Sequence, residues 1–172
     1  MAKLISLTDV PSCSDRSFIF DTNVWLYLLS DYSTKDFGYS EVYESVLSND
    51  IEILLPPIVA TEFVNRYCRQ AFEVFKNQGN NSKASYKHDF RPTMAYKIAY
   101  SYITQLVDVQ LFSFTKQIGI EEADLSKSIK NPVLADLNDD IILNIACRTN
   151  SVIVSHDRDF RNAPSRLLLL QL

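Results

Sequence analysis

Residues 18–23 read Phe-Ile-Phe-Asp-Thr-Asn, an apolar run that ends in an acidic residue. A short apolar run followed at once by turn-forming polar residues predicts a buried β-strand that gives way to a helix. Three more acidic residues follow an apolar run in the same way or lie in the opening turn of a predicted helix: Glu62, Asp139 and Asp157. The chain therefore carries four acidic residues at places where one element ends or the next begins.

The four acidic residues can meet at one edge of a sheet, because ligands of open α/β sheets bind beyond the carboxyl ends of the strands. Carboxylates gathered there repel one another, and a divalent cation relieves that repulsion. Each residue also has a simpler explanation by itself. Asp21 could cap the next helix, and Glu62 could be an exposed residue favoured by the helix dipole. We favour a metal site because all four residues occupy such positions in one chain.

The alternation of strand-like and helix-like segments predicts an α/β fold, in which a mostly parallel sheet is covered by helices on both faces. The expected strands are residues 17–21, 51–55, 109–114, 152–155 and 167–171. The expected helices are residues 23–30, 40–48, 58–76, 93–106, 121–129 and 137–149. A length of 172 residues fits a single domain over residues 1–172. The segment 76–91 is rich in asparagine and serine and predicts a basic polar insertion. It joins two helices that together should form an insertion beside the acidic residues.

The composition is that of an ordinary globular domain, with 47 % hydrophobic and 22 % charged residues. No apolar stretch reaches the roughly 20 residues of a membrane helix, and no signal sequence is expected at the N-terminus. Cys13, Cys68 and Cys147 are odd in number and far apart, which favours reduced thiols in a cytoplasmic protein. His88 and His156 lack partners at zinc-ligand spacing, and a catalytic Cys-His pair has no support beyond residue type. The three glycines form no nucleotide-binding loop.

Positive charge is concentrated between Arg66 and Lys97, where seven basic residues accompany two acidic ones in a chain of net charge −4. Five tyrosines are interleaved with these residues: Tyr67, Tyr86, Tyr96, Tyr100 and Tyr102. Such a segment can hold phosphates and stack unpaired bases, and Lys83, Lys87 and Arg91 are the candidate nucleic-acid contacts. It can equally be a solvated face whose tyrosines pack inward. The sequence leaves both interpretations open.

The helix expected at residues 137–149 carries adjacent acidic residues, of which one should face the site. At about 100° per residue, Ile142, Ile145 and Ala146 define an inward stripe. Asp139 lies on that stripe, whereas Asp140 points about a quarter turn away. We therefore expect Asp139 to be the ligand. Solvent or the helix N-terminus should satisfy both Asp140 and Asp136.

Together these segments resemble the PIN-domain nucleases. In that family a hydrophobic strand ends in Asp-x-Asn or Asp-x-Ser, a glutamate follows in mid-chain, a helix begins with Asp-x-x-Ile, and the last buried strand leads to Thr/Ser-x-Asp-x-Asp-Phe. The matching segments, in chain order, are Phe20-Asp21-Thr22-Asn23, Thr61-Glu62, Asn138-Asp139-Asp140-Ile141-Ile142 and Ser155-His156-Asp157-Arg158-Asp159-Phe160. No segment is specific alone, but their order and local context agree from one end of the chain to the other.

The resemblance implies a three-layer α/β/α fold and a metal-dependent endoribonuclease that hydrolyses RNA phosphodiester bonds. It also implies one or two bound Mg²⁺ or Mn²⁺ ions, whose ligands would be Asp21, Glu62, Asp139 and Asp157. Asn23 and Ser155, which match small polar positions of the family, would orient the ligands or a water molecule.

Many small bacterial PIN domains are toxins of toxin–antitoxin pairs, so the resemblance implies an antitoxin protein and a homodimer as partners. One alternative is a non-catalytic RNA- or protein-binding domain with the same fold. A phosphotransferase or phosphatase of the HAD type is disfavoured, because its second acidic residue would stand where this chain has Asn23.

Overall fold

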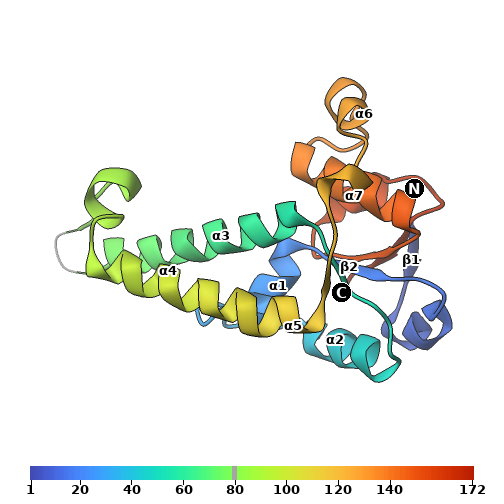
Figure 1. Cartoon of the computed structure of the whole chain (residues 1–172), viewed down its shortest axis with the longest axis horizontal. Helices are drawn as coiled ribbons and strands as arrows, with labels where there is room; N and C mark the ends of the chain where they lie inside the picture. The colour runs from blue at the N-terminus through green and yellow to red at the C-terminus, as the bar shows by residue number, and fades with distance from the viewer. Residues whose placement is uncertain (79–80) are drawn as a thin grey trace.

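A four-stranded parallel sheet forms the centre of the computed structural model, which describes residues 1–78 and 81–172 (Figure 1). Its strands, in spatial order, are β1 (Lys3–Ile5), β6 (Leu168–Leu170), β5 (Val152–Val154) and β2 (Phe18–Phe20). A bridge from Phe18 to Ile53 links β2 to a second parallel pair, formed by β3 (Leu54–Leu55) and β4 (Lys116–Gln117). The register pairs Phe20 with Val154, so β2 and β5 end at the same edge of the sheet.

Helices cover both faces of the sheet, and the predicted three-layer α/β/α arrangement is confirmed. The α-helices are α1 (Thr22–Leu29), α2 (Tyr39–Ser48), α3 (Pro57–Lys76), α4 (Met94–Leu106), α5 (Phe112–Phe114), α6 (Leu125–Lys130) and α7 (Leu137–Thr149). Shorter 3-10 segments occupy Leu7–Cys13, Ile120–Glu122 and Arg158–Asn162, and π-helical turns occupy Tyr86–Phe90 and Val107–Leu111. Within the described residues, none of these helices has the length and apolar character needed to cross a membrane.

The strands that lead into acidic residues lie at the centre of the core. Every residue of β2 and β5 is completely buried, which explains why both read as unbroken apolar runs. Phe20, the last residue of β2, packs against Trp25 of α1 with ring centroids 5.3 Å apart. The residue that follows Phe20 is Asp21, so its backbone is held by some of the most tightly packed residues of the protein.

Helices α3 and α4 form an antiparallel hairpin that projects away from the sheet (Figure 1). The base of α3 lies at the sheet, whereas its last residue, Lys76, lies about 20 Å further along the helix axis than Glu62, at about 1.5 Å per residue. The segment 76–91 is therefore at the tip of the hairpin. The two helices approach the acidic residues only at the base of α3, where Glu62 lies, and the described residues of segment 76–91 lie at the other end of this 20-residue helix. Gly79 and Asn80, which belong to that segment, lie outside the described residues.

One predicted strand needs correction, and two strands were not predicted. The strand expected at residues 109–114 is wrong, because the chain continues from α4 through a π-helical turn into α5. Val107 and Leu111 are buried four residues apart, which is helical spacing, while Val109 and Phe112 between and after them are exposed. The strand near this place is β4, which the sequence did not suggest, and β1 was also missed.

Candidate functional site

The four acidic residues singled out from the sequence line one cavity of about 380 Å³. Asp21 follows β2, Glu62 lies in the second turn of α3, Asp139 lies in the first turn of α7, and Asp157 follows β5. Four other side chains complete the wall of this cavity, hereafter the acidic cavity: Asn23, Arg66, Asp136 and Asp159. Residues far apart in the chain thus meet at the carboxyl ends of parallel strands.

Asp21 is the most buried member, with 4 % of its surface exposed. Its carboxylate accepts hydrogen bonds from the Thr22 backbone N–H at 2.6 Å, the Ser155 hydroxyl at 2.7 Å and the Asn23 amide at 2.6 Å. Burial raises the pKa of Asp21 to about 6, although the hydrogen bonds from Ser155 and Thr22 act in the opposite direction. The carboxylate is thus held in one orientation at some electrostatic cost.

Ser155 and Asn23 connect Asp21 to the segment that carries Asp157. The Ser155 oxygen accepts the backbone N–H of Asp157 at 3.0 Å while its hydroxyl donates to Asp21. The Asn23 side-chain oxygen accepts the backbone N–H of His156 at 3.1 Å while its amide donates to Asp21. These two side chains therefore fix the ends of β2 and β5 relative to each other, in the positions expected for orienting residues.

Glu62 and Arg66 lie one turn apart on α3, and both face the acidic cavity. The Thr22 hydroxyl donates to Glu62 at 3.3 Å, and an Arg66 guanidinium nitrogen lies 3.6 Å from the other Glu62 oxygen. Arg66 is half exposed and supplies positive charge to a cavity lined mostly by carboxylates. From the sequence, Arg66 was recognised only as part of the basic segment.

Asp139 is half-buried at the other side of the cavity. Burial raises its pKa to about 7, and repulsion from Asp21, Asp136, Asp157 and Glu62 adds to the effect. Asp136 accepts the backbone N–H groups of Asn138 and Asp139, so the expectation that the helix N-terminus satisfies it is confirmed. Asp139 accepts no side-chain hydrogen bond from the described residues, so a cation in the acidic cavity could bind its carboxylate without displacing one.

The expectation that Asp140 is satisfied by solvent or the helix N-terminus was wrong. Asp140 is 1 % exposed, and its side chain accepts the backbone N–H groups of Val133 and Leu134 at 2.6 and 3.0 Å. The Asn144 amide donates to its second oxygen at 3.1 Å. Its direction, away from the acidic cavity, agrees with the helical-face argument, but the segment before α7 folds back over it.

An acidic residue can both cap a helix and line the acidic cavity. Asp21, Asp136 and Asp157 each accept a backbone N–H at the start of a helix and each also line the acidic cavity. A carboxylate has two oxygens with several lone pairs, so one oxygen can cap while the other faces the cavity. The backbone contact then restricts the side-chain rotamer.

The donor set fits a hard divalent cation, since it consists of carboxylate oxygens with an amide and a hydroxyl nearby. In residues 1–78 and 81–172 no three acidic, histidine or cysteine side chains are already drawn together as a metal cluster. The carboxylates line a wider space instead, and ligation would require their side chains to rotate inward. Burial raises the pKa values of Asp21 and Asp139 and repulsion from neighbouring carboxylates adds to this, so a cation would offset the cost of holding these charges there.

The structure does not bring the candidate nucleic-acid contacts to the acidic cavity. Lys83, Lys87 and Arg91 are exposed at the hairpin tip. Tyr67 is buried, and Tyr86 and Tyr96 are partly buried with their rings against Phe90, whereas Tyr100 and Tyr102 are exposed. Inward packing therefore describes Tyr67 fully and Tyr86 and Tyr96 in part, but not Tyr100 or Tyr102.

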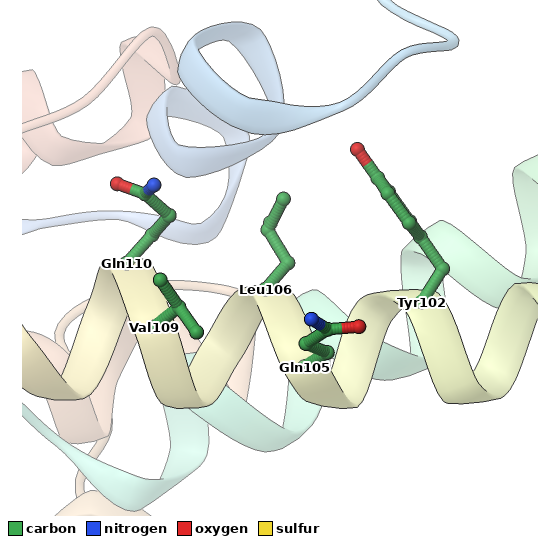
Figure 2. A pocket seen from close by; sticks show the side chains of 5 residues that line it. All are labelled: Tyr102, Gln105, Leu106, Val109 and Gln110. Atoms are coloured by element: carbon green, nitrogen blue, oxygen red, sulfur yellow. The ribbon is translucent and has the colours of Figure 1, made fainter.

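A separate groove of about 190 Å³ lies on the outer face of α4 and the turn after it (Figure 2). Its lining side chains are Tyr102, Gln105, Leu106, Val109 and Gln110. These residues offer neither an acid nor a base with a pKa near neutrality. The groove therefore has no chemistry comparable to that of the acidic cavity.

Comparisons with known proteins agree with this arrangement. The PIN domain family model matches residues 18–165. No relative was found among curated proteins. Among solved structures, the chain is similar to the crystal structure of VapBC2 from Rickettsia felis bound to a DNA fragment from their promoter, with a TM-score of 0.53. The similarity covers 90 % of this chain and 98 % of that chain at 17 % sequence identity, so it shows a shared fold.

Proposed function

The chain belongs to the PIN domain family, whose members are generally nucleases, and we propose that it is a divalent-metal-dependent endoribonuclease that hydrolyses RNA phosphodiester bonds. The observation that carries the proposal is the acidic cavity. Asp21, Glu62, Asp139 and Asp157 line it from four separate elements, and two of them have raised pKa values. A site that only stabilised the fold would gain nothing from burying several carboxylates close together.

The proposed cofactor is one or two Mg²⁺ or Mn²⁺ ions held by these four carboxylates. When bound, such ions polarise the scissile phosphate and neutralise charge on the leaving oxygen. Asp21 is the central ligand, because Ser155 and Asn23 hold it in a fixed orientation. Glu62, Asp139 and Asp157 complete the ligand set from the surrounding walls. Arg66 lies close enough to counter the negative charge of Glu62 and to contact the substrate phosphate.

We further propose that the protein is the toxin of a toxin–antitoxin pair, with an antitoxin protein and a second copy of the chain as partners. The support is the family membership together with the likeness to a VapBC2 structure. The whole of residues 1–172 would act as one domain, with residues 76–91 as a basic polar insertion at the hairpin tip. Free thiols at Cys13, Cys68 and Cys147 are in keeping with a cytoplasmic protein.

The proposal is tested by incubating the purified protein with a defined pool of single-stranded and structured RNA. Cleavage is expected with Mn²⁺ or Mg²⁺ and not in excess EDTA, because the carboxylates alone cannot activate water. Mapping the cut ends by sequencing would show internal cleavage. Equal cleavage with EDTA would exclude the metal mechanism. RNA binding without cleavage under any metal condition would favour the alternative, a non-catalytic binding domain of the same fold.

We propose a supporting role for the hairpin tip in binding longer RNA. Replacing Lys83, Lys87 and Arg91 together by glutamine should weaken binding of an RNA long enough to reach the tip from the acidic cavity. Each lost phosphate contact should reduce the slope of log K against log salt by about 0.7. Fluorescence anisotropy at several salt concentrations measures both quantities. Unchanged affinity and slope would identify the tip as a solvated face.

A further inference from the structure

A second cavity, of about 420 Å³, lies directly beside the acidic cavity. The two cavities share Asn23, Arg66 and Asp157 in their walls. The remaining wall of the second cavity is formed by Tyr27, His156 and Arg158. The acidic cavity is lined by five aspartate and glutamate side chains besides Asp157 and by one arginine, whereas the second cavity has, among the described residues, Asp157 as its one carboxylate and two arginines, Arg66 and Arg158.

The aromatic wall of the second cavity is held in place by its neighbours. The rings of Tyr27 and His156 meet edge to face with centroids 5.4 Å apart. Phe37 packs on His156 at 4.6 Å, and the Tyr39 hydroxyl lies 3.2 Å from the His156 ring nitrogen Nδ1. Tyr27 and His156 remain partly exposed, so the cavity presents fixed aromatic surface to its contents.

Phe37 reaches this position through an unusual backbone conformation. Its φ is +58°, in the left-handed region, and Gly38 follows with φ of +85°. A bulky residue in that region costs of order 1–3 kcal/mol, and such strain often accompanies binding sites. In this conformation the Phe37 ring packs against both Tyr27 and His156.

Two side chains, Asn23 and Arg66, connect the walls of the two cavities. Asn23 donates to the Asp21 carboxylate on one side and accepts the His156 backbone N–H on the other. Arg66 lines both cavities from α3. A chain of phosphates with one phosphate at the carboxylates would therefore carry its neighbouring nucleotide into the second cavity, where guanidinium groups and aromatic rings are present.

We propose that the second cavity binds the nucleotide adjacent to the scissile phosphate of single-stranded RNA. Arg158 and Arg66 contact its phosphate, because planar guanidinium groups suit phosphate oxygens. Tyr27 and His156 contact its base, as aromatic side chains do in other single-strand sites. The inference rests on the proposed function, since it assigns the substrate of the same site. A short RNA would contact this second cavity and would not reach the distant hairpin tip.

The test measures binding separately from cleavage. Each variant is made in an Asp139→Asn background with Mn²⁺ present, and binding of a fluorescent six-nucleotide single-stranded RNA is followed by anisotropy. A gel confirms that the RNA stays intact. Arg158→Gln should weaken binding about tenfold and reduce the salt slope by about 0.7, as expected for one lost phosphate contact. The matched control is Arg148→Gln, which removes an equally exposed charge from the far end of α7 and should change neither quantity.

The base contact is tested with two substitutions at one position. Tyr27→Leu should weaken binding of the same RNA severalfold, whereas Tyr27→Phe, which keeps the ring, should restore it. Melting temperatures of both variants show whether the fold is intact. If Arg158→Gln and Tyr27→Leu bind the RNA normally while the wild-type protein cleaves RNA with metal, the subsite is refuted and the proposed function stands. If the wild-type protein neither binds nor cleaves RNA, both proposals are refuted together.

Discussion

Replacing Asp139 by asparagine is expected to lower metal-dependent RNA cleavage by a factor of about a thousand or more. Asp139 is half-buried opposite Asp21, and its pKa is raised by burial and by the surrounding carboxylates. An amide at this position cannot supply the negative charge that attracts a divalent cation. A thousandfold loss corresponds to about 4 kcal/mol of transition-state stabilisation, which is in the range expected for losing a metal ligand. Initial cleavage rates with saturating Mn²⁺ provide the measurement.

Asp140→Asn is the matched control, since it makes the same chemical change at the next residue. The amide group would direct N–H donors at Asn144 or at the backbone N–H groups of Val133 and Leu134. The free energy of unfolding should therefore fall by about 1–3 kcal/mol. Activity per folded molecule should fall less than about tenfold. The opposite ranking of the two variants in cleavage would mean that α7 presents another face to the acidic cavity.

The stability of the metal-free protein is expected to fall as the pH rises from about 4 to 7. Asp21 and Asp139 have pKa values of about 6 and about 7, above the ordinary value of 3.8. In this pH range the folded protein therefore holds protons that the unfolded chain has already released, and the free energy of unfolding decreases with pH. Allowing for solvent screening around half-exposed Asp139, we expect a loss on the order of 2 kcal/mol, or about 5 °C in melting temperature.

Mn²⁺ should reverse this loss, because the cation binds the deprotonated carboxylates. At a metal concentration a hundredfold above Kd, the stabilisation is about 2.7 kcal/mol. The gain in melting temperature should be larger at pH 8 than at pH 5, where protons compete for the same oxygens. Asp139→Asn should flatten the pH dependence of the metal-free protein and reduce the effect of Mn²⁺. A metal-free protein equally stable at pH 5 and pH 8 would show that the pKa values of Asp21 and Asp139 are not raised in the folded protein.

The parts of the fold that the sequence predicted are those where burial alone determines the pattern. Strands β2, β5 and β6 are apolar runs because both of their faces are covered, and α3 shows helical spacing because one face packs on the core. The acidic residues at the strand ends could be found for the same reason. They stand directly after runs whose burial is easy to recognise.

The errors arose where tertiary contacts decide the outcome. The segment 109–114 is apolar enough for a strand, but Val107 and Leu111 pack as a continuation of α4. Asp140 was assigned to solvent or the helix N-terminus because helical periodicity describes only α7 itself. The segment that covers it, around Val133 and Leu134, comes from outside the helix. Local sequence contains no signal for such a contact.

Arg158 and His156 were overlooked for a related reason. They stand beside Asp157 in a family motif, and their role depends on Tyr27 and Arg66, which come from α1 and α3. The position of Arg66, one turn after Glu62 on a predicted helix, was a signal that could have placed it near the acidic cavity.

The sheet order has a consequence for how the chain acquires activity during synthesis. β1 pairs with β6, so Lys3 can form its strand contacts only after Leu168 has been synthesised. The acidic cavity likewise needs both Asp21 and Asp157. The hairpin of α3 and α4, in contrast, is made of neighbouring segments and can form early. Nascent chains emerge at about 5–20 residues per second and fold as they do so. A growing chain would therefore lack the complete acidic cavity, and with it the proposed ribonuclease activity, until Asp157 and β6 had been translated.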